Sequence, residues 1–162
     1  TSGGFGVGPV KKIVSALSGS EIKFQVLVVC GHNESLRQEL TEQYKDKDRP
    51  VVKVFGFVNF MDELMSVSDI MVAKAGGLIS SESIAKGLPL LTISSIPGQE
   101  SRNCGLLVAS GAAIKLGKVE RITGIVEMLH NDRARLQAMK DSIKKIARPN
   151  TSLEIAKFVL NL

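Results

Sequence analysis

Hydrophobic positions along the chain fall into short continuous runs separated by longer stretches with helical spacing. Four apolar runs, at 24–30, 51–55, 70–73 and 88–93, have the length of buried strands, and a fifth at 112–116 is typical of an edge strand. The run at 24–30 is almost entirely apolar, which predicts a central parallel strand buried on both faces. Strands that alternate with helices predict an α/β fold with a doubly wound, Rossmann-like parallel sheet.

Apolar residues three or four positions apart predict the helices. The expected segments are 10–17, 34–44, 59–66, 99–110, 120–129, 132–147 and 153–162, together with a helix that opens near Ser80 and ends before Gly87. Asn33 stands directly before one of these patterns, and Asn59 stands at the very start of another. Because Asn side chains accept hydrogen bonds from the first amides of a helix, we expect both residues to be N-caps.

The stretch 70–103 carries the strongest sequence signal for a binding site. The apolar run 70–73 ends at Lys74, and the Gly76-Gly77 joint leads into the helix that contains Glu82. Glycines allow a close backbone approach to a ligand, and the start of a helix favours an anion. In open parallel sheets ligands bind at the carboxyl ends of strands, where such turns lie.

A second glycine-rich segment opens the chain, at 3–8, and Pro9 suits the first turn of the helix that follows. The spacing from Gly3 to Gly8 is that of a P-loop, but Pro9 stands where Lys is required. A dinucleotide fingerprint is also excluded, because a third Gly is missing at position 9. The segment is either a phosphate-binding loop or a plain flexible terminus.

Composition restricts the possible partners. The 162 residues carry a net charge of +5, which fits a phosphate ligand or an anionic membrane surface. Aromatic residues make up only 4% and Trp is absent, which argues against a nucleic-acid partner. No apolar run reaches the roughly 20 residues of a membrane span. Cys30 and Cys104 lack metal-ligand spacing and are typical of buried reduced thiols in a cytosolic protein.

The residues near the predicted strand ends suit a nucleotide sugar. No nucleophile elbow, zinc signature or Ser-His-Asp arrangement is present. The amides around Gly76 and Gly77 can hold phosphates, and Glu82 can accept hydrogen bonds from ribose hydroxyls. Gln99 and Glu100 can bind the hydroxyls of a sugar. Each carboxylate also has a structural alternative, a favourable charge near a helix N-terminus.

Several motifs together resemble the donor-binding, C-terminal domain of GT-B glycosyltransferases. They are 74–78, Glu82, 86–89, 97–100 with Asn103, the loop 3–6, the segments 29–33 and 54–58, and 148–149. The sequence is most similar to the monogalactosyldiacylglycerol synthases and processive diacylglycerol glucosyltransferases, and more distantly to the lipid II-forming peptidoglycan glycosyltransferase. The resemblance implies that residues 1–162 form one donor-binding domain.

The resemblance also implies roles for individual residues. Gly4 and Gly6, helped by Gly76 and Gly77, would lie near the diphosphate. Val58 would meet the uracil through its backbone, with Phe57 beside it; packing of both on the core is the structural alternative. Ile79 stands where the family often has a Thr that reaches a phosphate, and Ser80 would take over that contact. The remaining implied donor-binding residues are Asn33, Lys74, Glu82, Gln99 and Glu100.

The implied activity is an inverting, metal-independent transfer of a hexose from a UDP-sugar to a lipid such as diacylglycerol, without a cofactor. The resemblance places the catalytic base and the lipid-binding surface in an N-terminal domain outside this sequence, with the first strand of this domain before Thr1. It also implies a cytoplasmic enzyme, peripheral at the membrane. Two alternatives remain open: a sugar-nucleotide epimerase on the same fold, and a non-catalytic module that binds a protein partner.

Overall fold

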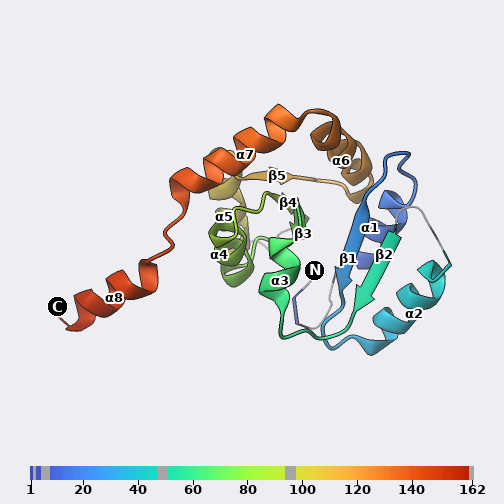
Figure 1. Ribbon diagram of the computed structural model, residues 1–162, viewed down its shortest axis with the longest axis horizontal. Coiled ribbons are helices and arrows are strands. Elements are labelled where there is room, and N and C mark those ends of the chain that lie inside the picture. The colour runs from blue at the N-terminus through green and yellow to red at the C-terminus, as the bar shows by residue number, and fades with distance from the viewer. Residues whose placement is uncertain (2, 5–7, 47–50, 94–97, 161–162) are drawn as a thin grey trace.

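A computed structural model describes residues 1, 3–4, 8–46, 51–93 and 98–160. Strands and helices alternate along the chain as the apolar pattern predicts (Figure 1). The strands are β1 (Gln25–Val29), β2 (Val51–Phe55), β3 (Met71–Ala73), β4 (Leu90–Thr92) and β5 (Ala113–Lys115). The helices are α1 (Val10–Leu17), α2 (Glu34–Tyr44), α3 (Met61–Ser66), α4 (Gly77–Ala85), α5 (Gln99–Ala109), the 3-10 turn η1 (Val119–Arg121), α6 (Ile122–Asn131), α7 (Arg133–Ile146) and α8 (Thr151–Leu160).

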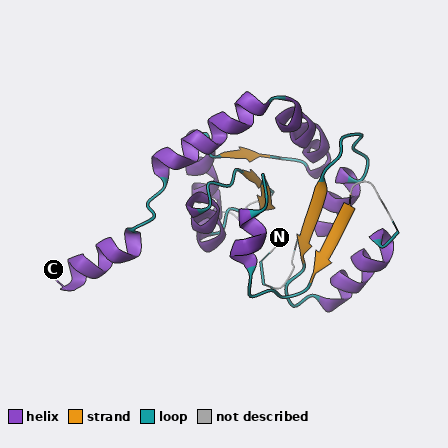
Figure 2. Ribbon diagram, viewed as in Figure 1, coloured by secondary structure: helices purple, strands orange, loops and turns teal. Residues whose placement is uncertain are grey.

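All strand pairs in the described part of the chain are parallel, which confirms the predicted α/β class. The strands form two hydrogen-bonded ladders, β1-β2 and β3-β4-β5, in place of one continuous sheet. Strand β5 lies at an edge, as its short apolar run predicts. Figure 2 shows helices around both ladders.

The prediction of a central strand at 24–30 is wrong for the described residues. β1 pairs only with β2, and its burial is complete only at its carboxyl-terminal end, where Val28 and Val29 lie in the core. Gln25 is exposed, and Val26 and Leu27 are half-buried. The reason is that the free edge of β1 borders a cavity of about 690 Å³, which we call the interstrand cavity. Its walls include Gln25–Val28 of β1 and Ile70 and Val72 at β3.

Three apolar clusters hold the helices on the ladders. One joins α1 and α6 to Leu91 of β4, a second joins α5 and α7 to β3 and β4, and a third packs α1 and α2 on β1. Helix α7 is amphipathic and buries Leu136, Met139 and Ile143. Every residue of α8 is exposed, and this helix projects away from the rest of the molecule (Figure 1). No described helix is long and apolar enough to cross a membrane.

The two predicted N-caps have different outcomes. Asn33 is confirmed, because its side-chain oxygen accepts a hydrogen bond of 3.0 Å from the amide of Leu36. The prediction for Asn59 is wrong: α3 begins at Met61, its N-cap is Phe60, and no side chain caps it. The ring of Phe60 packs edge-on against Phe55 with centroids 6.2 Å apart. This aromatic contact holds the residue before the helix, so the helix starts one position later than a cap at Asn59 would place it.

Candidate functional site

The first group of candidate residues gathers where β1 and β2 end. Gly31 follows β1 with a φ of 59°, and its Cα faces the carbonyl of Gly4 so closely that no side chain fits between them. The amide of His32 donates a hydrogen bond of 2.8 Å to the same Gly4 carbonyl. Gly4 is therefore fixed at the carboxyl end of β1. Gly6 lies outside the described residues.

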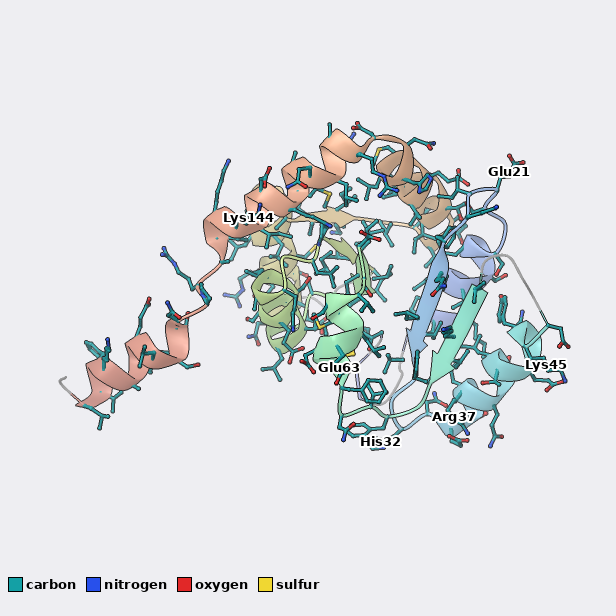
Figure 3. All side chains as sticks on the ribbon, viewed as in Figure 1. Glu21, His32, Arg37, Lys45, Glu63 and Lys144 are labelled. Atoms are coloured by element: carbon teal, nitrogen blue, oxygen red, sulfur yellow. The ribbon has the colours of Figure 1, made fainter. Side chains whose placement is uncertain are left out.

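An aromatic stack links the two strand ends. The rings of His32 and Phe57 lie 4.5 Å apart between centroids, with an angle of 14° between their planes. Phe57 is 64% exposed, so its core-packing alternative is wrong and much of its ring surface is open to a ligand. Val58 beside it is half-buried. Figure 3 shows His32 with Arg37 of α2 at this end of the β1-β2 ladder.

The second group surrounds the turn from β3 to α4. Gly76 is the N-cap of α4 in an extended conformation, and no side chain in the described part of the chain caps the helix. A Cβ added at Gly77 would meet nothing within 4 Å, so no described neighbour crowds the side-chain position of this residue. The first amides of a helix have no partner within it, and they favour an anion. Lys74, at the end of β3, is half-buried and forms no ion pair with any described residue.

Glu82 lies farther along α4 than the sequence indicates. It is the sixth residue of the helix, and no acidic residue occupies the first turn. Because the helix dipole acts only within the first turn, a favourable helix charge does not explain this carboxylate. The side chain is exposed and makes no hydrogen bond or ion pair with a described residue. It is therefore free to bind a ligand.

Helix α5 begins beside the same turn. Gly98 precedes it with a φ of 111°, no side chain among the described residues caps it, and Gln99 is exposed at its first position. Glu100 is half-buried in the first turn of α5, where its structural alternative, a helix-start charge, remains valid. The side chain of Asn103 donates a hydrogen bond of 3.2 Å to the carbonyl of Ala75. This bond places the uncapped starts of α4 and α5 next to each other.

One buried contact fixes α5 from within, whereas a buried hydroxyl of α4 has no partner among the described residues. The hydroxyl of Thr92 in β4 lies 3.2 Å from the sulfur of Cys104 in α5, and both side chains are buried. Ser80 in α4 is 6% exposed, and its hydroxyl has no hydrogen-bond partner among the described residues. The predicted phosphate contact of Ser80 stays a prediction, and it requires a ligand oxygen that reaches below the surface of the helix.

The interstrand cavity is separate from both groups. None of the described candidate residues lines it; its walls come from strand edges and apolar helix faces. The candidate residues instead form two open surfaces at strand ends, one around Gly4, His32 and Phe57 and one around the starts of α4 and α5. Sequence reasoning assigned no role to Gly31 or Asn103, although each holds a candidate loop in place. The signal available for Gly31 was its position directly after an apolar strand.

Comparison with known proteins identifies the family. Residues 8–155 match the glycosyltransferase family 28 C-terminal domain, so the chain belongs to this family. It is 36% identical over 160 residues to the processive diacylglycerol beta-glucosyltransferase of Bacillus cereus (strain AH187). This similarity covers 98% of the chain and 41% of that enzyme. The chain therefore spans less than half the length of its curated relative.

Solved structures show the same fold. The crystal structure of Acinetobacter baumannii MurG matches with a TM-score of 0.80 and 20% identity, over 99% of the chain and 49% of that protein. Phytolacca americana UGT2, complexed with UDP-2fluoro-glucose and pterostilbene, matches with a TM-score of 0.64 and 17% identity, over 99% and 40%. The chain thus has the fold of a GT-B glycosyltransferase C-terminal domain, as the sequence motifs predict.

Proposed function

We propose that residues 1–162 form the donor-binding domain of a glycosyltransferase that transfers a hexose from a UDP-sugar to a lipid acceptor such as diacylglycerol. The main support is the start of α4 at Gly76 and Gly77, which no described side chain caps, with the Glu82 carboxylate beyond it, which pairs with no described residue. An amide-lined helix start suits a diphosphate, and a free carboxylate suits a pair of ribose hydroxyls. The named activity of the Bacillus cereus relative supports the lipid acceptor.

The other candidate residues receive roles from their positions. The exposed face of Phe57 stacks against the uracil, and the Val58 backbone meets its edge. Gly4 approaches the diphosphate from the side of β1, and Gly6 shares this role by its place in the sequence motif. Gln99 and Glu100 bind the hexose, because α5 begins beside the α4 turn through the Asn103 hydrogen bond to Ala75. Asn33 and Lys74 complete the donor-binding set.

The proposed reaction inverts the anomeric carbon and uses neither a metal ion nor a cofactor. A base in the N-terminal domain of the full-length enzyme removes the proton from the acceptor hydroxyl, which attacks the anomeric carbon. The bond to UDP breaks, and the amides at the starts of α4 and α5 stabilise the charge on the departing diphosphate. The full-length enzyme is cytoplasmic and peripheral at an anionic membrane surface, consistent with the net charge of +5.

A titration of this chain with uridine diphosphate tests the donor site. We expect Glu82→Gln to weaken binding by about 10- to 100-fold, because hydrogen bonds to a charged group contribute about 1.5–3 kcal/mol. The matched control is Glu154→Gln on the projecting helix α8, which should bind as the parent does. The 2′-deoxy analogue of UDP supplies the second arm: the parent chain should bind it more weakly than UDP, and Glu82→Gln should discriminate less.

Equal UDP affinity for the parent and Glu82→Gln would remove Glu82 from the site. Absence of any UDP binding to the full-length enzyme would refute the donor role itself. Transfer is tested with the full-length protein, UDP-glucose or UDP-galactose, and vesicles that contain diacylglycerol. A β-linked glycolipid formed in the presence of EDTA is the expected product, whereas an epimerised nucleotide sugar with no glycolipid would favour the epimerase.

A further inference from the structure

The loop that carries Phe57, residues 56–59, receives no backbone support from the neighbouring strand. In a parallel ladder that continued past Phe55, the Phe57 amide would donate to the Cys30 carbonyl, because the Cys30 amide already bonds the Phe55 carbonyl at 2.9 Å. The Cys30 carbonyl instead accepts a bond of 3.2 Å from the amide of Asn33. No backbone hydrogen bond joins residues 56–59 to another residue in the described part of the chain. The orientation of the Phe57 ring therefore depends on side-chain contacts.

His32, in the loop after β1, has firm backbone support. Its amide donates a bond of 2.8 Å to the Gly4 carbonyl, and its own carbonyl accepts a bond of 3.0 Å from the amide of Glu34. Gly31 before it meets Gly4 too closely for any side chain, and Asn33 after it caps α2. Figure 3 shows His32 beyond the carboxyl ends of β1 and β2. The backbone of His32 is thus held between the Gly4 carbonyl and the start of α2.

The imidazole of His32 is stacked on the ring of Phe57. The ring centroids lie 4.5 Å apart and the planes differ by 14°, so the imidazole covers one face of the phenyl ring. Phe57 is 64% exposed, and its other face is open. The side chain of Arg37 supports the same loop, because a Cβ added at Gly56 would lie 3.2 Å from the Arg37 Cδ. The loop after β2 therefore packs on side chains that follow β1.

Arg37 is itself held in place. Its Nε donates a hydrogen bond of 2.7 Å to the carboxylate of Glu34 within α2. Both side chains that contact the loop thus come from one short segment, 32–37, whose start is fixed by the Gly4 carbonyl and the Asn33 cap. This segment sets the position of Phe57 before any ligand binds.

We infer that His32 is a positioning residue for the base of the donor: its imidazole fixes the plane of the Phe57 ring and closes one face, so that a base stacks on the opposite face. The inference rests on the proposed function, in which the uracil stacks on Phe57. A ring whose orientation is already set contributes more affinity than one that must be ordered on binding. A planar base gains most from such a surface, because stacking needs parallel faces. His32 therefore favours a planar base without contacting it.

Titration of the full-length enzyme with UDP and with 5,6-dihydrouridine diphosphate tests the inference. The dihydro base keeps the hydrogen-bonding edge of uracil, but its ring is puckered and stacks poorly. The parent enzyme should bind UDP about 3- to 10-fold more tightly than the dihydro compound. His32→Ala should at least about halve this affinity ratio, whereas His32→Phe, which keeps a stacking ring, should retain it.

The affinity ratio separates stacking from a general loss of structure. A damaged fold or diphosphate site would weaken both ligands together and leave the ratio unchanged. Phe57→Ala should lower the ratio as well, and the double variant with His32→Ala should lower it no further. The matched control is His130→Ala in the last turn of α6, whose side chain belongs to the wall of the interstrand cavity and which should keep the parent ratio.

Two results would overturn the inference while the donor site stands: an unchanged ratio in His32→Ala, or a ratio that His32→Phe fails to retain. Absence of UDP binding by the parent enzyme would instead remove the donor role and the inference together. The two failures are therefore distinguishable in the same titration.

Discussion

Replacement of Gly31 by Ala tests how the glycine-rich loop is held at the site. Gly31 has a φ of 59°, and a Cβ there would lie 2.6 Å from the carbonyl carbon of Gly4 and closer still to its oxygen. Ordinary carbon contacts are about 3.5–4.0 Å, so the loop must move by about 1 Å. A shift of this size breaks the hydrogen bond of 2.8 Å from the His32 amide to Gly4.

The expected loss of stability combines two terms. The left-handed conformation costs Ala about 1–2 kcal/mol, and the broken backbone bond costs about another 1–1.5 kcal/mol. Gly31→Ala should therefore lower the free energy of unfolding by about 2–3.5 kcal/mol. Gly87→Ala is the matched control: Gly87 has a φ of 65° but no atom within 4 Å of an added Cβ, so it carries only the first term.

Urea unfolding followed by circular dichroism measures the difference. With an m-value of about 2 kcal/mol per M, Gly31→Ala should lower the midpoint by about 1–1.7 M and Gly87→Ala by about 0.5–1 M. Gly31→Ala should also weaken UDP binding, because the Gly4 carbonyl leaves its position beside His32. Equal shifts of the two midpoints, or unchanged UDP affinity in Gly31→Ala, would refute the idea that this close approach fixes the loop.

Three further predictions concern the frame of the domain. Asn33→Ala should lower the free energy of unfolding, measured in urea, by about 1 kcal/mol because α2 loses its cap, whereas Asn33→Ser should retain most of the stability. An equal loss in both variants would contradict a capping role. Leu91→Ala should cost about 3 kcal/mol because Leu91 is 0% exposed, whereas Leu153→Ala, at 56% exposure, should stay within about 0.5 kcal/mol. Burial raises the pKa of the Cys30 thiol. The buried, protonated thiol therefore contributes fully to the free energy of unfolding below about pH 8.5, and this contribution is lost as the pH rises through the folded pKa. A pH series of urea midpoints checks this, with Cys30→Ala as the control that lacks the contribution; rapid iodoacetamide labelling of Cys30 in the native protein at pH 8 would contradict its burial.

Much of the local structure follows from residues near one another in the chain. Helix α5 starts at Gln99, directly after Gly98, and α2 starts after Asn33, because each of these signals acts within one helical turn. The prediction of an N-cap at Asn59 fails because a tertiary contact overrides the local signal. The Phe60 ring packs on Phe55, and this contact decides where α3 begins, although the sequence offers an acceptable cap two residues earlier.

In the candidate site, too, some features follow from local sequence and others only from tertiary contacts. Sequence motifs named Gly76, Gly77 and Glu82, but only the structure places Glu82 in the second turn of α4, beyond the range of the helix dipole. The neighbourhood of the α4 and α5 starts depends on the Asn103 bond to Ala75, which joins residues 28 positions apart. The His32-Phe57 stack likewise joins two different strand ends.

The α/β class, the order of strands and helices, and the family all follow from the amino-acid sequence, because apolar spacing, caps and short motifs act over a few residues. Which strand edges pair and which remain open depends on the packing of the folded domain. Strand pairing depends on backbone groups that are far apart in the chain. β1 pairs with β2, β3 pairs with β4, and the strand edges at Leu27 and Val72 border a cavity. Local patterns specify how each strand forms, but the partner of a strand is set by the packing of the whole domain.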